Sequence, residues 1–369
     1  MYNNSDSVCI IPRWESEISA NSNDVYKPDS GDTQEYKVRV TVNYGFLNDK
    51  EHWAENLKDN GQWIKVYSNG DDFSIETGID PGKDPEHWMR DLAANIAGKT
   101  LKTVILPATH DSGSFSADMT SGVRTQTLNF KEQLERGIRF LDLRVTYSTD
   151  SPALGFKANE FYLCHDGISA TNLLLIDQLN LVKDFAKSHP KEIILLNFHK
   201  FLNGIYAIPN QAKNMSDDKK KELATLVSDT FSDVLIPKGS SDVSIADIQA
   251  SGKNIFILFS GNDAFDDNIK TLWDSYTSDL GATVEEKIAH MSNYFEENLK
   301  KDRSGNFLNC STAVWSLNIR GGAKEVNPEV IDWLGKWNAD EEYKKNMNIF
   351  IVDFFDEYDY VSTVINLNK

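Results

Sequence analysis

Cysteine, positive charge and long apolar runs are all scarce in this sequence. The three cysteines among its 369 residues are too few and too widely spaced for a disulfide framework or a cysteine-based zinc site. No stretch of about 18 apolar residues occurs, so we expect no transmembrane helix. The formal net charge of −18, with no basic stripe to offset it, argues against nucleic acid as a partner.

The beginning of the sequence also lacks a basic head followed by an apolar core, so we expect no secretory leader. A reducing cytosol is the default location, and a secreted form whose leader has been removed is the alternative. A composition of 40% hydrophobic and 25% charged residues is typical of a folded protein with a sizeable core.

The first 85 residues differ in character from the rest of the chain. Residues 1–35 are polar, which predicts a loosely attached arm. In residues 36–46 apolar and polar side chains alternate, as they do in a half-buried strand. Residues 62–78 contain Asn69-Gly70 between two runs of β-forming residues, which predicts a hairpin. We therefore predict an arm and a small β-rich domain of unknown role over residues 1–85.

Pro81, Gly82 and Pro85 mark the junction to the second predicted domain, residues 86–369. There, apolar runs that resemble strands alternate with amphipathic stretches such as 171–188 and 283–300, which we expect to be helices. The strand-like runs are 101–106, 138–145, 161–165, 192–201, 254–261, 313–319 and 348–355. This alternation predicts an α/β fold, a distorted TIM-type (β/α) barrel with a mostly parallel sheet.

Polar residues recur at the ends of these predicted strands, where barrel enzymes carry their chemistry. They are His110-Asp111, Asp142 and Arg144, His165-Asp166, then Asn197, His199 and Lys200, and finally Asp353. Two histidines can serve as base and acid on a phosphodiester, and an arginine can hold the phosphate. Carboxylates can orient each histidine. Such a set favours attack by a neighbouring hydroxyl of the substrate, without a metal.

Each of these residues also has a structural explanation. Arg144 lies within a predicted buried strand and needs an anionic partner, so a salt bridge to Asp142 or Asp111 would account for it. Asp353 could brace a barrel layer, and His110 could be an ordinary loop residue. The remaining histidines outside the set, at positions 52, 87, 189 and 290, have polar neighbours and are expected to be solvated.

At these residues the sequence resembles the catalytic X domain of phosphatidylinositol-specific phospholipase C (PI-PLC), in particular members that consist of an X domain alone. The resemblance covers about three quarters of the chain. It is carried by the motifs HWMRDL, ILPATHDSGSFS, QLERGIRFLDLRV, FYLCHDG, SHPKEIILLNF and NIFIVDFF.

The resemblance implies a role for each residue. His110 would take the proton from the inositol 2-hydroxyl and pair with Asp353, while His165, helped by Asp111, would protonate the leaving diacylglycerol oxygen. Arg144 would brace the phosphorus where calcium-dependent members have an acidic residue, so calcium independence and the absence of a cofactor are expected. Asn197, His199, Lys200 and Asp166 would contact the substrate. The implied partner is phosphatidylinositol or a related lipid at a membrane surface, bound by a monomer.

Two departures from the family pattern bear on this interpretation. The usual His-Gly of the third strand is His165-Asp166-Gly167 here, and Ser260 stands where bacterial members present a basic residue to the inositol ring. Two alternatives follow. A catalytically silent scaffold is one, and a glycerophosphodiesterase is the other, although Asp142-Leu143-Arg144 lacks the metal-binding Glu-x-Asp that such an enzyme needs.

Overall fold

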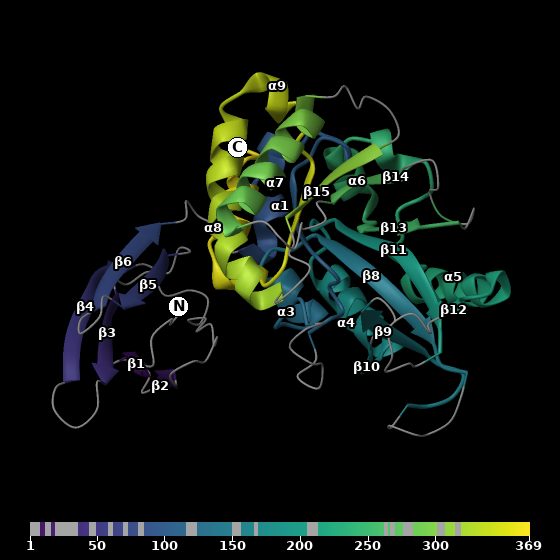
Figure 1. Cartoon of the computed structure of the whole chain (residues 1–369), viewed down its shortest axis with the longest axis horizontal. Coiled ribbons are helices and arrows are strands. Elements are labelled where there is room, and N and C mark those ends of the chain that lie inside the picture. The colour runs from purple at the N-terminus through teal and green to yellow at the C-terminus, as the bar shows by residue number, and fades with distance from the viewer. Residues whose placement is uncertain are drawn as a thin grey trace. The chain divides into compact units, whose positions relative to one another are not determined.

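The computed structural model describes most of residues 85–369 and separate strands of residues 1–84. The described residues are 8–11, 16–18, 36–43, 49–57, 62–68, 73–79, 85–115, 124–149, 156–165, 169–204, 213–261, 265, 270–275, 283–300, 307–313 and 319–369. The chain divides into two compact units, Met1–Asp84 and Pro85–Lys369 (Figure 1).

The first unit contains antiparallel strands only, among its described residues. One sheet has the order β2-β1-β3-β4, and β5 pairs with β6 in a separate hairpin. The strands are β1 (Val8–Ile11), β2 (Ser16–Ile18), β3 (Tyr36–Asn43), β4 (Asp49–Leu57), β5 (Gln62–Ser68) and β6 (Phe73–Ile79). The predicted hairpin is therefore present, with Asn69-Gly70 outside the described residues. The predicted arm is not wholly irregular, because the apolar run of β1 pairs with β3.

The second unit is a distorted (β/α) barrel, as predicted. Seven parallel strands follow the order β14-β15-β16-β7-β8-β11-β13, and among the described residues no pairing joins β13 to β14. These strands are β7 (Leu106–Thr109), β8 (Phe140–Tyr147), β11 (Ile194–Asn203), β13 (Ile255–Phe259), β14 (Lys270–Ser275), β15 (Phe307–Ala313) and β16 (Ile349–Val352). Three short strands lie outside this path, β9 (Phe161–His165), β10 (Ser169–Leu174) and β12 (Lys213–Asn214).

Helices connect these strands and cover the outer face of the sheet. The longer ones are α4 (Leu175–Ser188), α5 (Asp217–Phe231), α7 (Val284–Lys300) and α8 (Ile319–Asn338). The shorter ones are α1 (Trp88–Asp91), α2 (Ala93–Ile96), α3 (Phe130–Glu135), α6 (Ile245–Ser251), α9 (Glu341–Lys344) and α10 (Tyr360–Asn366), with 3₁₀ turns at Pro85–His87, Ser240–Asp242 and Phe355–Glu357. Figure 1 shows α7 and α8 side by side. None of the described helices has the length and apolar character needed to cross a bilayer.

The alternation of side chains along each strand separates two apolar layers. Leu141 of β8 and Leu196 of β11 face outward and belong to the cluster that packs against the helices. Phe140 and Leu195, one residue earlier on the same strands, belong to an inner cluster with Trp88 of α1. The inner cluster fills the interior of the barrel at the N-terminal ends of the strands. The inward-facing residues nearer the C-terminal ends are polar.

Three predicted boundaries were wrong. The strand predicted over 101–106 is β7 at Leu106–Thr109, because the side chain of Asn348 binds the carbonyls of Leu101 and Val104 and holds that segment in a turn.

Residues 171–174, predicted as the start of a helix, belong to β10 (Ser169–Leu174) instead, and α4 begins at Leu175. The strand predicted over 313–319 is β15 at Phe307–Ala313, and Ile319 begins α8, while 314–318 lie outside the described residues. The helix predicted over 283–300 is confirmed as α7.

Candidate active site

The C-terminal ends of four neighbouring strands carry polar side chains above the inner apolar layer. They are His110 after β7, Asp142 and Arg144 of β8, Asn197 and His199 of β11, and Asp353 after β16. Each lies two or four residues beyond an inner apolar residue of its own strand, which places it on the inward face. Along each strand, the inward-facing side chains are therefore apolar at the N-terminal end and polar at the C-terminal end.

His110 is held between a carboxylate and a guanidinium. Its Nδ1 lies 2.8 Å from Oδ1 of Asp353, and its Nε2 lies 2.6 Å from Nη2 of Arg144. Because Arg144 can only donate, Nε2 is the acceptor and Nδ1 carries the proton that is donated to Asp353. Burial lowers the pKa of His110, but Asp353 outweighs this effect and raises the pKa above its ordinary value. The arrangement is that of a base whose basicity a carboxylate increases.

Arg144 is the central cation of this cluster. Its side chain is only 8% exposed, and its Nη1 and Nη2 lie 3.7 Å from carboxylate oxygens of Asp111 and Asp142 respectively. The structural explanation, a salt bridge to these two residues, therefore describes its surroundings correctly. The same guanidinium also contacts His110, so an anion that binds beside His110 could accept hydrogen bonds from Arg144.

Asp111 occupies a strained and buried position. Its φ angle is +39°, and its backbone N–H donates to Oδ2 of Asp142 at 2.8 Å. Burial raises the pKa of Asp111 to about 7, although the charge of Arg144 opposes this rise. Near neutral pH this group therefore exchanges a proton readily.

Hydrogen bonds from a neighbouring loop fix the turn that carries His110 and Asp111. The hydroxyl of Thr125 lies 3.0 Å from the carbonyl oxygens of both residues, and the amide of Gln126 donates to the carbonyl of His110 at 2.9 Å. The sequence had not identified either residue. The only signal is their polarity within an otherwise unassigned loop, which does not distinguish them from other polar loop residues.

A second network ties the turn to β8. The N–H of Ser112 donates to the carbonyl of Asp142 at 2.9 Å, and the N–H of Asp142 donates to Oγ of Ser112 at 2.8 Å. Gln133 of α3 donates to the carbonyl of Ser112 at 2.9 Å and lies 2.8 Å from the hydroxyl of Thr109. The Thr-His-Asp-Ser motif is thus a rigid turn whose outer residues hold the inner two.

His165 reaches the site by a route that the sequence had not indicated. It ends β9, which runs antiparallel to β8 with Leu163 opposite Val145, and is not a parallel barrel strand as predicted. Because β9 is antiparallel to β8, its last residue lies near the turn after β7, and Nε2 of His165 is 3.8 Å from Oδ2 of Asp111. Gly113 makes this approach possible, because a Cβ there would lie 2.9 Å from Cδ1 of Leu163.

Three of the four residues predicted to contact the substrate lie within the described residues, all on β11. Asn197 is buried opposite Asp142 in the register of β11 and β8. Lys200 is half-buried opposite Arg144, and Asp166 lies outside the described residues. His199 comes between them at a bulge, with its Nε2 2.5 Å from Oδ1 of Asp142.

The contact with His199 also affects the charge of Asp142. Burial alone would raise the pKa of Asp142, but His199 and Arg144 outweigh burial and hold the pKa below its ordinary value. Asp142 is therefore a permanent anion at the base of the cluster.

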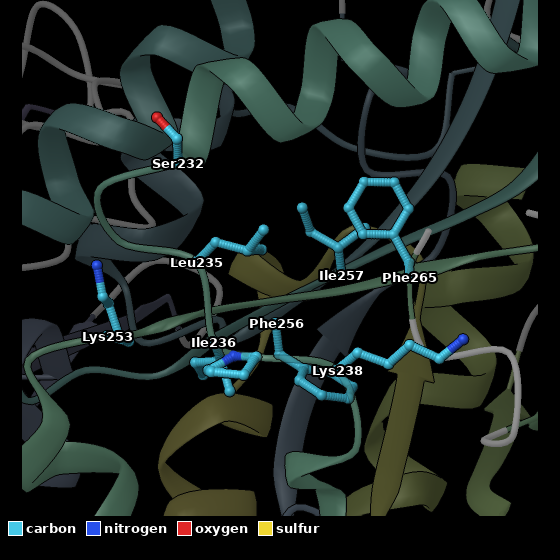
Figure 2. Close-up of a pocket in the computed structure, with 9 residues that line it drawn as sticks. Ser232, Leu235, Ile236, Lys238, Lys253, Phe256, Ile257 and Phe265 are labelled. Carbon is cyan, nitrogen blue, oxygen red and sulfur yellow. The ribbon is translucent and has the colours of Figure 1, made fainter. Parts of the chain in front are cut away.

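An apolar pocket lies elsewhere on the barrel, beside β13. It is lined by Leu235, Ile236, Phe256, Ile257 and Phe265, with Lys238 and Lys253 among the other residues shown in Figure 2. None of the candidate site residues that the structure describes lines this pocket. The pocket and the polar cluster are therefore separate features of the barrel.

This chain is similar to known proteins over about three quarters of its length. No family model matches the chain. PI-PLC X domain-containing protein 3 of Danio rerio is 25% identical over 324 residues, which are 76% of this chain and 92% of the relative. PI-PLC X domain-containing protein 2 of Mus musculus is 24% identical over 319 residues, 76% and 87% of the two chains.

Solved structures give the same result for the fold. A mutant phosphatidylinositol-specific phospholipase C from Staphylococcus aureus superimposes with a TM-score of 0.57 at 19% identity, covering 78% of this chain and 98% of the other. The enzyme from Listeria monocytogenes gives 0.54 at 19% identity, covering 78% and 100%. The resemblance predicted from the motifs is confirmed, and the fold is that of bacterial PI-PLC.

Proposed function

We propose that this chain, which is similar to the PI-PLC X domain-containing proteins and has the fold of bacterial PI-PLC, is a metal-independent phosphodiesterase that cleaves phosphatidylinositol-type lipids. The observation that supports it most strongly is the grouping of two histidines around one guanidinium. His110 touches Arg144, and His165 approaches Asp111, which is itself 3.7 Å from Arg144. A phosphate bound by Arg144 would therefore have an imidazole at either side.

In the proposed reaction His110 is the general base. Its Nε2 takes the proton of the inositol 2-hydroxyl, and the oxygen so activated attacks the phosphorus. Asp353 keeps the proton on Nδ1 and stabilises the imidazolium that forms. Nε2 becomes available once the substrate phosphate takes its place beside Arg144.

His165 is the general acid of the same reaction. As the bond between O2 and phosphorus forms, the bond from phosphorus to the glycerol oxygen breaks, and that oxygen takes a proton from His165. Oδ2 of Asp111 lies 3.8 Å from Nε2 of His165 and can return a proton to the ring near neutral pH. The products are diacylglycerol and inositol 1,2-cyclic phosphate, and exchange of protons with water restores both histidines.

Arg144 supplies the positive charge that a metal would otherwise provide. Asp111 and Asp142 fix its guanidinium, so its N–H groups are oriented before the substrate arrives and need little reorganisation as charge develops on the phosphate oxygens. A calcium ion at this position would be repelled by the guanidinium. We place the substrate at a membrane surface, with Asn197, His199 and Lys200 toward its head group.

The test is an assay of the pure protein on phosphatidylinositol vesicles in the presence of EDTA, with the products followed by ³¹P NMR. Wild type and His290→Ala, which removes an exposed imidazole from α7, should release the cyclic phosphodiester at the same rate, and His110→Ala should not. Release of glycerol phosphate only when a metal is added would indicate a glycerophosphodiesterase. No turnover of any phosphodiester would identify the silent scaffold.

A further inference from the structure

Three potential metal ligands meet at the opposite end of the barrel from the candidate active site. Glu86 and His87 belong to the 3₁₀ turn that opens the second unit, and His189 lies between α4 and β11. One ligand atom from each of the three lies within 4.8 Å of the others. His189 was expected to be solvated, but it is buried with 9% of its surface exposed. No step of the proposed reaction uses these residues.

The surroundings of His189 fix its ring and its tautomer. The ring stacks on Phe185 at a centroid distance of 4.0 Å and an angle of 11°. Its Nδ1 lies 2.9 Å from the carbonyl oxygen of Phe185, which only accepts, so Nδ1 carries a proton. The hydroxyl of Ser188 is also 2.9 Å from Nδ1, and that hydroxyl donates to the carbonyls of Asp184 and Phe185. Nε2 is therefore the nitrogen that points away from the helix.

The Nε2 of His189 faces a carboxylate. It lies 2.9 Å from Oε1 of Glu86, and with the proton on Nδ1 both of these atoms present electron pairs. A divalent metal ion bound by both atoms would satisfy this contact, as would a second proton on the imidazole. A ring nitrogen that donates to a backbone carbonyl while the other nitrogen is free to ligate is the usual support of a metal-bound histidine.

His87 supplies a second imidazole. Its ring centroid is 4.6 Å from that of His189, with the planes tilted by 46°. Two imidazoles and one carboxylate form a ligand set that zinc uses in proteins, with water in the fourth position.

One buried ion pair holds both segments in place before any metal binds. Arg139 contacts Glu192 through Nη2 at 2.7 Å and Nε at 3.0 Å, and both side chains are at most 1% exposed. The same Nη2 donates to the carbonyl of Glu86 at 2.6 Å, and the N–H of Glu192 donates to the carbonyl of His189 at 2.9 Å. Arg139 and Glu192 therefore tie the backbone of Glu86 to that of His189.

We propose that Glu86, His87 and His189 form a binding site for a divalent cation of the zinc class. Tetrahedral zinc ligands about 2.1 Å from the metal lie about 3.4 Å apart, so closing the site needs side-chain shifts on the order of 1 Å. The bound ion would link the first turn of the second unit to the segment between α4 and β11. This site does not depend on the proposed phosphodiesterase activity.

Calorimetric titration of the metal-free full-length protein with Zn²⁺ tests the proposal. One equivalent should bind, and Glu86→Gln and His87→Ala should each lower the affinity at least tenfold. His290→Ala is the matched control, because it removes an exposed imidazole from α7 and should leave the affinity unchanged. With Co²⁺ in place of zinc, wild type should show the intense visible absorption of a tetrahedral complex, and His87→Ala should not.

Thermal unfolding provides a second measurement that remains valid if a variant is less stable. Zn²⁺ should raise the melting temperature of wild type and of His110→Ala, but not that of His87→Ala. The proposal is overturned if wild type binds no Zn²⁺ at millimolar concentration, or if His87→Ala binds as tightly as wild type. It is equally overturned if His110→Ala, and not His87→Ala, loses the ion, because the metal would then lie in the candidate active site.

Discussion

Nδ1 of His110 lies 2.8 Å from Oδ1 of Asp353, although 243 positions separate the two residues in the chain. Each follows directly after a paired strand residue, since Thr109 of β7 stands opposite Val352 of β16. The N–H of His110 also donates to the carbonyl of Val352 at 3.1 Å. The parallel pairing of two barrel strands therefore sets the position of the candidate base relative to its carboxylate.

Replacing this carboxylate should change both the rate and its pH dependence. The base acts in its unprotonated form, and Asp353 raises the pKa of His110, so activity in wild type is lost as the pH falls through that raised value. In Asp353→Asn the pKa falls, and the acidic limb of kcat/KM should move to lower pH. The maximum rate should drop by about 10²-fold, since the amide no longer stabilises the imidazolium.

Asp356→Asn is the matched control for this experiment. Its carboxylate accepts from the hydroxyl of Thr127, and it belongs to the 3₁₀ turn Phe355–Glu357, which begins two residues after Asp353. Its profile should overlay that of wild type. An acidic limb that stays in place in Asp353→Asn would show that His110 is not the base or that the carboxylate does not control it.

Asp111 should make the protein less stable as the pH rises through neutrality. Its pKa is about 7 in the folded protein and about 3.8 in the unfolded chain, so between these values the folded state binds more protons. The stabilising contribution is complete below about pH 4 and is lost as the pH passes 7. Wild type should therefore lose up to about 4 kcal/mol more unfolding free energy than Asp111→Asn between about pH 4 and pH 8.

Urea unfolding of both proteins at a series of pH values measures this difference. Other titrating groups are common to the two proteins, so only the gap between the two curves matters. Parallel curves across the range would mean that Asp111 is ionised throughout and that its proposed exchange of a proton with His165 is wrong.

Arg144 should not be replaceable by lysine. Its guanidinium contacts His110 with one nitrogen and approaches Asp111 with the other, and an ammonium group cannot keep both contacts. Arg144→Lys should lower kcat/KM about 10²- to 10³-fold, with calcium and EDTA both without effect. Activity that calcium restores in this variant would show that the site is adapted to a metal and not to a guanidinium.

The buried pair of Arg139 and Glu192 should contribute strongly to stability. Arg139→Met leaves a carboxylate that is 1% exposed without its cation, which typically costs about 3–5 kcal/mol. The exposed pair of Lys131 and Glu135 on α3 is the control, because Lys131→Met should cost less than about 0.5 kcal/mol. Equal losses of unfolding free energy in Arg139→Met and Lys131→Met, measured by urea unfolding, would show that the buried pair contributes no more to stability than the exposed pair.

Much of the barrel and its polar mouth was predictable because each element leaves a local signature. Apolar runs mark the buried strands, and the two-residue period places Asp142 and Arg144 on one face before any coordinates are known. The rule that barrel chemistry lies at the C-terminal ends of strands then brings His110 and Asp353 to the same side.

The residues that the sequence did not reveal depend on long-range geometry. The direction of β9 depends on how the connection from β8 reverses, which no residue pattern fixed. The contact of His199 with Asp142 was not predicted, because the register shift of β11 beside His199 has no sequence signal. His189 was expected to be solvated because polar neighbours in sequence do not show that Phe185 and Glu86 cover it.

The most direct test of the central claim separates the roles of the two histidines by the leaving group. Each of wild type, His110→Ala and His165→Ala is assayed on an inositol phosphodiester with an alkyl leaving group and on its nitrophenyl counterpart, which needs no proton to depart. His165→Ala should lose about 10²-fold or more on the alkyl ester and recover most of its rate on the nitrophenyl ester, whereas His110→Ala should be slow on both. Equal losses for His165→Ala on the two substrates would contradict the division of base and acid between the two imidazoles.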